Sequence, residues 1–105
     1  FNPGFTAPLV SPCPMVTVFH DLQHKRHPEY FRWFDLPAWR FFLYWSARRS
    51  QRLIAVSEAT RLDLLRFYGL PEDKIAVVPH GVDPAFFALG REQQRLRNLI
   101  LCVST

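Results

Sequence analysis

The sequence predicts an α/β fold built on a parallel sheet, and three observations support this class. Residues 53–56 and 75–79 are short apolar runs that stop abruptly at small or polar residues, as strands do. The residues between them have the spacing of one amphipathic helix, which makes the segment a βαβ unit. A third apolar run, residues 15–19, ends in the same way at His20 and Asp21. In open sheets of this class, ligands bind just beyond the carboxyl ends of the strands.

The first half of the chain predicts a loop, a strand, a polar connection and a long helix. Residues 1–14 hold four prolines, which exclude a helix or a central strand. The first strand covers residues 15–19, and residues 22–34 form a connection with one helical turn near 29–33. Pro37 suits the first turn of a helix that runs to about residue 51, before a second strand over residues 52–56.

The second half predicts a well-delimited helix, a third strand and a linker. Ser57 is a good N-cap and Gly69 suits a left-handed C-terminal position, which places a helix over residues 58–68. Residues 75–79 are the next strand, and residues 82–89 predict a turn anchored by Phe86 and Phe87. Residues 90–98 are polar, and residues 99–105 are an apolar run typical of a buried strand.

Composition narrows the class of protein only partly. The formal charge of +4 permits an anionic partner such as a nucleotide-sugar, a lipid surface or nucleic acid. Cys13 and Cys102 have neither the spacing of a metal site nor that of a disulfide framework, which favours a reducing, cytoplasmic compartment. The sequence contains no apolar run long enough to span a membrane and no phosphate-binding Gly-rich motif of a dehydrogenase or P-loop protein.

Three ordered blocks, TVFHD at 17–21, IAVSEAT at 54–60 and VPHGVD at 78–83, resemble the family 4 glycosyltransferases of the GT-B fold. The resemblance implies that residues 1–90 form the later part of a Rossmann-like, acceptor-side N-terminal domain. Residues 91–98 would then be the interdomain linker, and residues 99–105 the first strand of a truncated donor-binding C-terminal domain. Because two such domains need roughly three times this length, we expect a fragment that is inactive alone.

The same resemblance implies a retaining transferase that moves a hexose from UDP- or GDP-hexose to a glycan or lipid-linked acceptor. We expect no cofactor and no nucleic-acid partner. The cysteines favour a cytoplasmic location, and the aromatic and arginine-rich helix face favours peripheral contact at the inner face of the membrane. The alternative is a non-enzymatic basic module that binds membrane or nucleic acid. That alternative rests on the charge and on an aromatic and arginine-rich helix face.

His20 is the candidate catalytic residue, because an imidazole donates hydrogen bonds to charge that develops at a reacting sugar. The alternative is a histidine that only caps its strand. Asp21, Ser57, Glu58, Thr60, His80 and Gly81 are candidates for substrate-binding or supporting roles, and the resemblance places residues 57–60 and 80–81 beside the cleft. For Asp21 the simpler role is to hold its loop through backbone amides, and the family often has Asn at the position of His80. For Ser57 the simpler role is helix capping. Gly81 suits a positive φ or a close backbone approach, and a plain turn is the alternative for residues 79–83.

Two further groups of residues are candidates for binding. His20, His24 and His27 suggest a metal site only weakly, since their spacing is not a standard one and Lys25 and Arg26 intervene; we expect no metal. The simpler interpretation of residues 24–27 is an exposed basic loop.

On the helix over residues 36–52, helical periodicity predicts a core stripe and an opposite membrane or partner face. The stripe comprises Leu36, Trp39, Leu43, Ala47 and Ser50, and the face comprises Phe41, Trp45, Arg48 and Arg52. Aromatic and arginine side chains are suited to contact the interface of a bilayer or an acceptor lipid. The alternative is that a neighbouring helix covers this face.

Overall fold

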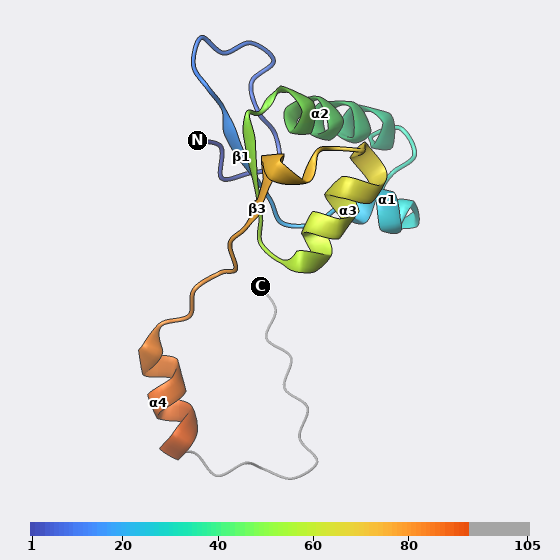
Figure 1. The fold of residues 1–105 in the computed structure, drawn as a ribbon. Coiled ribbons are helices and arrows are strands. Elements are labelled where there is room, and N and C mark those ends of the chain that lie inside the picture. Colours follow the sequence, from blue (N-terminus) through green and yellow to red (C-terminus); the bar gives the residue numbers. More distant parts are fainter. Residues whose placement is uncertain (93–105) are drawn as a thin grey trace.

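The computed structural model describes residues 1–92 and confirms the predicted α/β class (Figure 1). Its sheet consists of β1 (Val16–Phe19), β2 (Arg52–Ala55) and β3 (Ile75–Val77) in the order β1-β2-β3, and both pairings are parallel. In the central strand β2, Ile54 is paired with Val18 of β1 on one side and with Ala76 of β3 on the other. This is a small, Rossmann-like partial sheet in which all three strands end at the same edge.

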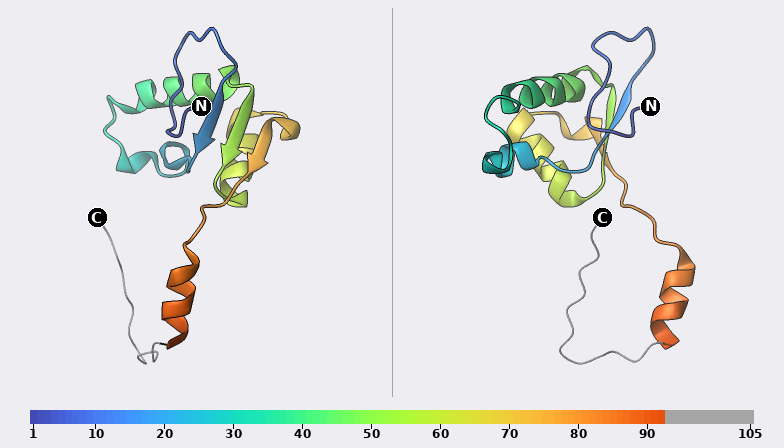
Figure 2. Two further views of the ribbon diagram at one scale, coloured as in Figure 1. Left: turned by 90° about the vertical axis from the view of Figure 1, so that its left-hand side faces the viewer. Right: turned by 180° about the vertical axis from the view of Figure 1, so that it is seen from behind.

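Helices fill the connections between the strands. Between β1 and β2 lie α1 (Gln23–Arg26), a 3₁₀ turn η1 (Pro28–Tyr30) and α2 (Leu36–Arg49). Between β2 and β3 lie α3 (Glu58–Tyr68) and a second 3₁₀ turn η2 (Glu72–Lys74), and α4 (Pro84–Glu92) follows β3. Helices α1, α2 and α3 gather on one face of the sheet, while α4 stands away from it (Figures 1 and 2).

The core lies between the sheet and these helices. Alternate strand residues point toward the helices, so Phe19, Leu53 and Ala55 are fully buried against Leu64 of α3 and Leu43 of α2. Leu22, Ala47, Tyr68, Leu70 and Ile75 complete the cluster. The predicted core stripe of α2 is only partly correct, because Ser46 is buried, whereas Trp39 remains 42% exposed.

Buried polar contacts fix how α2 lies on the sheet. The hydroxyls of Thr17 in β1 and Ser50 after α2 are 2.7 Å apart, and Ser50 also donates to the carbonyl of Ser46. The Ser46 hydroxyl in turn accepts a hydrogen bond from the backbone N–H of Ala7 at 2.8 Å. The N-terminal segment is therefore tied to α2, and a parallel bridge between Asn2 and Thr17 ties it to the outer edge of β1.

The opposite face of the sheet is also apolar. Val18, Ile54, Val56 and Val78 alternate with the core-facing residues, and none of the three helices α1 to α3 covers them (Figure 2). Parallel strands commonly carry apolar residues on both faces, because both faces are usually covered. The sheet thus presents an apolar surface next to the edge where the strands end.

Three sequence predictions about local structure are wrong. Residues 82–89 were expected to form an anchored turn, but Pro84–Glu92 is helical, and Phe86 and Phe87 are 69% and 64% exposed. Proline at the first helical position and the Asp83 carboxylate, which accepts from the N–H of Ala85, explain this helix start. Gly81 does not have a positive φ. The short helix α1 was not expected.

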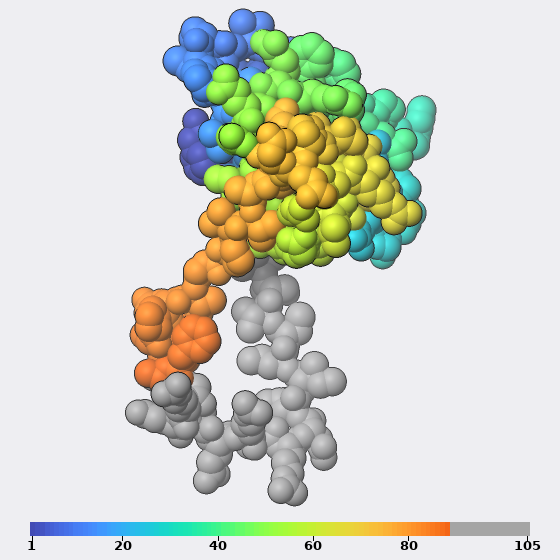
Figure 3. All heavy atoms as spheres, viewed as in Figure 1, coloured from blue at the N-terminus to red at the C-terminus, as the bar shows by residue number. Residues whose placement is uncertain are grey.

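Two parts of the predicted domain organisation cannot be compared with the structure. Most of the expected linker, residues 93–98, and the expected strand at 99–105 lie outside the described residues. Figure 3 shows α4 projecting from the body formed by the sheet and the other helices.

The predicted C-terminal boundary of α3 gives a test of local stability. Gly69 has φ +58° and donates its N–H to Leu65, as the sequence predicts. Because a Cβ disfavours this left-handed conformation, Gly69→Ala should lower the free energy of unfolding by about 1 kcal/mol. Urea denaturation of the full chain measures this. Gly4→Ala is the matched control, since Gly4 lacks a positive φ and has open space around it; an equal loss in both variants would contradict the explanation.

Candidate functional site

His20 and His80 meet at the carboxyl edge of the sheet. His20 follows β1 directly and His80 lies just after β3, and their imidazole rings stack with centroids 5.3 Å apart and planes 20° apart. Together with Gly81 they line a hollow of about 320 Å³. Its floor is the apolar sheet face opposite the helices, with Val18, Ile54 and Val56, and Phe1 and Pro3 of the N-terminal segment also line it. Three residues that the sequence singled out therefore share one hollow.

His20 is held by contacts on three sides. Its Nε2 lies 3.2 Å from the carbonyl oxygen of Pro3, an acceptor, so this nitrogen carries the proton. The ring of Phe5 lies 5.3 Å from the imidazole. The backbone carbonyl of His20 accepts a hydrogen bond from the buried Thr60 hydroxyl at 2.8 Å. The imidazole is thus oriented, and Nδ1 is the nitrogen left for a ligand.

The start of α3 lies directly behind His20. Ser57 is the N-cap, as predicted, and its hydroxyl accepts from the N–H of Thr60 at 3.1 Å. Glu58, in contrast, turns to solvent and pairs with Arg61 at 2.6 Å. Of the three α3 candidates, Thr60 touches His20, Ser57 supports Thr60, and Glu58 points elsewhere.

Asp21 lies on the other side of the chain from His20, as expected for consecutive residues leaving a strand. Its Oδ1 accepts a hydrogen bond from the N–H of Gln23 at 3.3 Å, which opens α1 in the way that Asx residues commonly do. Asp21 borders a different pocket, formed with α1 and α2. The structure therefore separates Asp21 from the hollow of His20 and His80.

The expectation of an exposed basic loop at residues 24–27 is wrong for His24, and Arg26, although 53% exposed, is held by an ion pair. His24 is 3% exposed, and its Nε2 lies 3.0 Å from the hydroxyl of Tyr68. Arg26 makes two hydrogen bonds to the buried carboxylate of Asp63, at 2.6 and 2.8 Å. These contacts raise the pKa of Arg26, while burial raises that of Tyr68. Residues 24–27 thus dock α1 onto α3.

The three histidines considered for a metal site have separate partners. His20 is hydrogen-bonded to the carbonyl of Pro3, and His24 to the hydroxyl of Tyr68. His27 lies 3.0 Å from the carboxylate of Glu29. Within residues 1–92, no group of three or more histidine, cysteine or acidic side chains converges as metal ligands would. The exposed thiol of Cys13 is unpaired within this part of the chain.

The predicted membrane or partner face of α2 consists of two parts in the structure. Phe41 and Trp45 stack at 6.1 Å and are exposed, and the guanidinium of Arg49 lies over the Trp45 ring. Arg48 instead donates to the carbonyl of Tyr68, and Arg52, which lies in β2, donates to that of Asp73. None of the described helices is both long and apolar enough to cross a bilayer.

Sequence reasoning missed the aromatic residues around Asp21. Phe5, Phe31 and Trp39 line its pocket, although they come from the N-terminal loop, the segment after η1 and helix α2. Helical periodicity assigned Trp39 to the core, and the loop residues had no periodic signal. Their convergence depends on tertiary packing, which a single sequence does not display.

A sequence model of Glycosyltransferase Family 4 matches residues 2–86, which is most of the chain. The match includes the strands, α1 to α3 and both histidines of the stacked pair. The chain therefore belongs to glycosyltransferase family 4, and its partners are a sugar donor and an acceptor. Searches among curated proteins and among solved structures each returned no match.

The environment of His24 predicts how stability depends on pH. Burial, and then the charges of Lys25 and Arg40, lower the pKa of His24 from 6.5 to about 4, opposed in part by Asp21. Between these values the unfolded chain binds a proton and the folded chain does not. The free energy of unfolding should therefore be highest above pH 6.5 and about 2 kcal/mol lower at pH 5.

Urea denaturation of the full chain at pH 7 and at pH 5 measures this loss. His24→Gln keeps a side chain that can hydrogen-bond Tyr68 but removes the titration, so its pH dependence should be flatter. His27→Gln is the control because His27 is exposed. If the free energy of unfolding of His24→Gln depended on pH as strongly as that of the wild type, His24 would not be the source of the pH dependence.

Proposed function

We propose that this chain is part of a retaining transferase that uses a nucleotide-sugar and moves a hexose to a glycan or lipid-linked acceptor. The donor would be UDP- or GDP-hexose. The observation that supports the proposal most directly is the stacked pair of His20 and His80 at the edge where the parallel strands end. Ligands bind at this edge in open α/β sheets.

His20 would act at the reacting sugar. As the glycosidic bond to phosphate breaks, negative charge grows on the leaving oxygen and the sugar acquires oxocarbenium character. Because Nε2–H is held by the Pro3 carbonyl, Nδ1 would present its lone pair to the sugar, where it would accept a hydrogen bond from a hydroxyl and stabilise the positive, oxocarbenium character of the ring. Thr60 and Pro3 hold His20 in place. We assign no protein nucleophile, so retention would occur by displacement on the same face of the sugar.

The proposal extends to domain organisation and location. Residues 1–90 would form the later part of the acceptor-side domain, residues 91–98 the linker and residues 99–105 the first strand of a donor-binding domain. A cytoplasmic enzyme that meets the inner face of the membrane would suit a lipid-linked acceptor. The exposed Phe41 and Trp45, with Arg49 over Trp45, support such a contact because aromatic and arginine residues favour the bilayer interface.

Substitution of His20 tests the transferase proposal. His20→Ala in the intact protein should lower kcat by about a hundredfold or more, because the group that stabilises charge in the transition state is lost. The measurement is transfer from UDP- or GDP-hexose to a lipid-linked acceptor, with the anomeric configuration of the product read by NMR.

His27→Ala is the matched control, since His27 is exposed and pairs only with Glu29 among the described residues. Retained kcat in His20→Ala would remove His20 from the chemistry. An inverted product would contradict the retaining mechanism.

The membrane contact is tested by combining Trp45→Ala with Arg49→Ala, since the guanidinium of Arg49 lies over the Trp45 ring. If the α2 face inserts at the interface, binding to vesicles of anionic phospholipid should weaken about tenfold and become less sensitive to salt. Sedimentation with vesicles gives the partition coefficient. Leu62→Ala, which removes an exposed apolar side chain from α3, is the control. Equal partition of the double variant and the wild type would refute the contact.

A further inference from the structure

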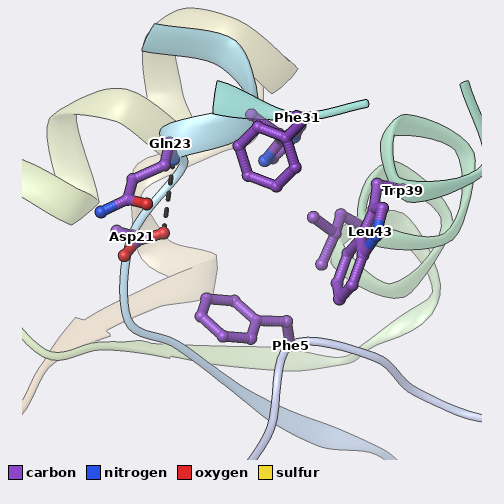
Figure 4. Close-up of a pocket in the computed structure, with 7 residues that line it drawn as sticks. Phe5, Asp21, Gln23, Phe31, Trp39 and Leu43 are labelled. Atoms are coloured by element: carbon purple, nitrogen blue, oxygen red, sulfur yellow. Dashed lines mark hydrogen bonds between the residues drawn. The ribbon is translucent and has the colours of Figure 1, made fainter. Parts of the chain in front are cut away.

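A second pocket, of about 270 Å³, opens beside the end of β1 on the helix-covered side of the sheet. The rings of Phe5, Phe31 and Trp39 surround it, and Asp21 lies on the wall opposite Trp39 (Figure 4). These residues come from the N-terminal segment, the chain after η1, helix α2 and the end of β1. Trp39 is 42% exposed although it belongs to the sheet-facing stripe of its helix.

The walls of this pocket are fixed by contacts that need no ligand. Phe5 packs edge-on against the buried Phe19, with ring centroids 6.4 Å apart. Phe31 meets His24 edge-on at 6.5 Å, and His24 is itself bonded to Tyr68. Preformed walls of this kind lower the cost of ordering groups when a ligand binds.

The chemistry of the walls suits a neutral ligand with one apolar face and several hydroxyls. Aromatic rings pack against C–H groups, and a carboxylate accepts hydrogen bonds from hydroxyls. The Oδ1 of Asp21 accepts a hydrogen bond from the N–H of Gln23, whereas its Oδ2 accepts none within residues 1–92. A phosphate would be repelled by Asp21, and His24 does not compensate because its lowered pKa keeps it neutral.

We propose that this pocket holds one pyranose ring of the acceptor, with the ring stacked on Trp39 and a hydroxyl bonded to Asp21. This inference rests on the proposed transferase function and names the ligand of a second site beside it. A volume of about 270 Å³ is near the lower end for small-molecule pockets, which suits one sugar ring rather than an extended hydrocarbon chain.

Phe5 connects this pocket to the proposed centre of transfer. Its ring lines the pocket and also lies 5.3 Å from the imidazole of His20. A sugar bound against Phe5 is therefore separated from His20 by one aromatic ring. This is a suitable position for an acceptor whose next hydroxyl reaches over Phe5 toward the donor sugar.

Titration of the full chain with the methyl glycosides of glucose, mannose and galactose tests the pocket directly. The indole N–H signal of Trp39 and the backbone amide signal of Gln23, which also lines the pocket, should shift in a saturable way with at least one glycoside in ¹H–¹⁵N NMR spectra, and the Gln23 signal reports binding in the Trp39 variant. Trp39→Ala should weaken that binding by about tenfold, and Asp21→Asn should weaken it as well. Trp33→Ala is the matched control, because Trp33 is 84% exposed and outside the pocket.

Three results would overturn the inference. One is the absence of any saturable shift with the three glycosides, and another is a shift caused by 1-hexanol but not by a glycoside, which would indicate a hydrocarbon site. Equal glycoside affinity in Trp39→Ala and the wild type, with both variants folded by circular dichroism, would also overturn it.

A transfer assay with the intact protein separates this inference from the proposed function. Trp39→Ala should raise KM for the acceptor and leave KM for the nucleotide-sugar unchanged. If hexose is transferred but acceptor KM does not change, the pocket assignment fails and the transferase function stands. If glycosides bind at Trp39 but no donor supports transfer, the pocket assignment stands and the transferase function fails.

Discussion

Because β2 pairs in parallel with both β1 and β3, the residues that follow the outer strands must emerge at the same edge of the sheet. This constraint brings His20 and His80 into contact although sixty positions separate them in the chain. A shift of one residue in either register would turn alternate side chains to the opposite face of the sheet. Burial of Phe19 and Leu53 under the helices therefore also fixes which side of the sheet His20 occupies.

Two polar contacts fasten the first crossover to α3. Residues 20–35 have little regular structure, yet the bidentate pair between Arg26 and Asp63 and the bond between His24 and Tyr68 fasten this segment to α3. Removing Arg26 would leave the buried carboxylate of Asp63 without its partner, which costs more than the pair contributes. The geometry around Asp21 therefore depends on α3, which lies much later in the sequence.

The boundaries of α3 were predictable because the signals at both ends are local: a serine at the N-cap and a glycine that adopts a left-handed conformation. The two histidines could be placed at one edge for a similar reason, since strand ends are visible in the apolar pattern. Trp39 and Phe5 could not be assigned to a pocket, because their meeting depends on how α2 and the N-terminal segment pack. Residues 84–92 were expected in part as a turn because the apolar pair Phe86 and Phe87 suggested an anchor, but both are exposed.

Phe5 lies between His20 and the pocket that contains Asp21. On one side its ring lies 5.3 Å from the imidazole of His20, which lines the hollow on the opposite face of the sheet. On the other side it borders a pocket whose only acidic wall residue, within the described chain, is Asp21. The ring of Phe5 thus separates the imidazole of His20 from the pocket of Asp21. Since Phe5 lies in a proline-rich segment anchored at Asn2 and Ala7, this separation depends on the same backbone contacts that attach the segment to the sheet and to α2.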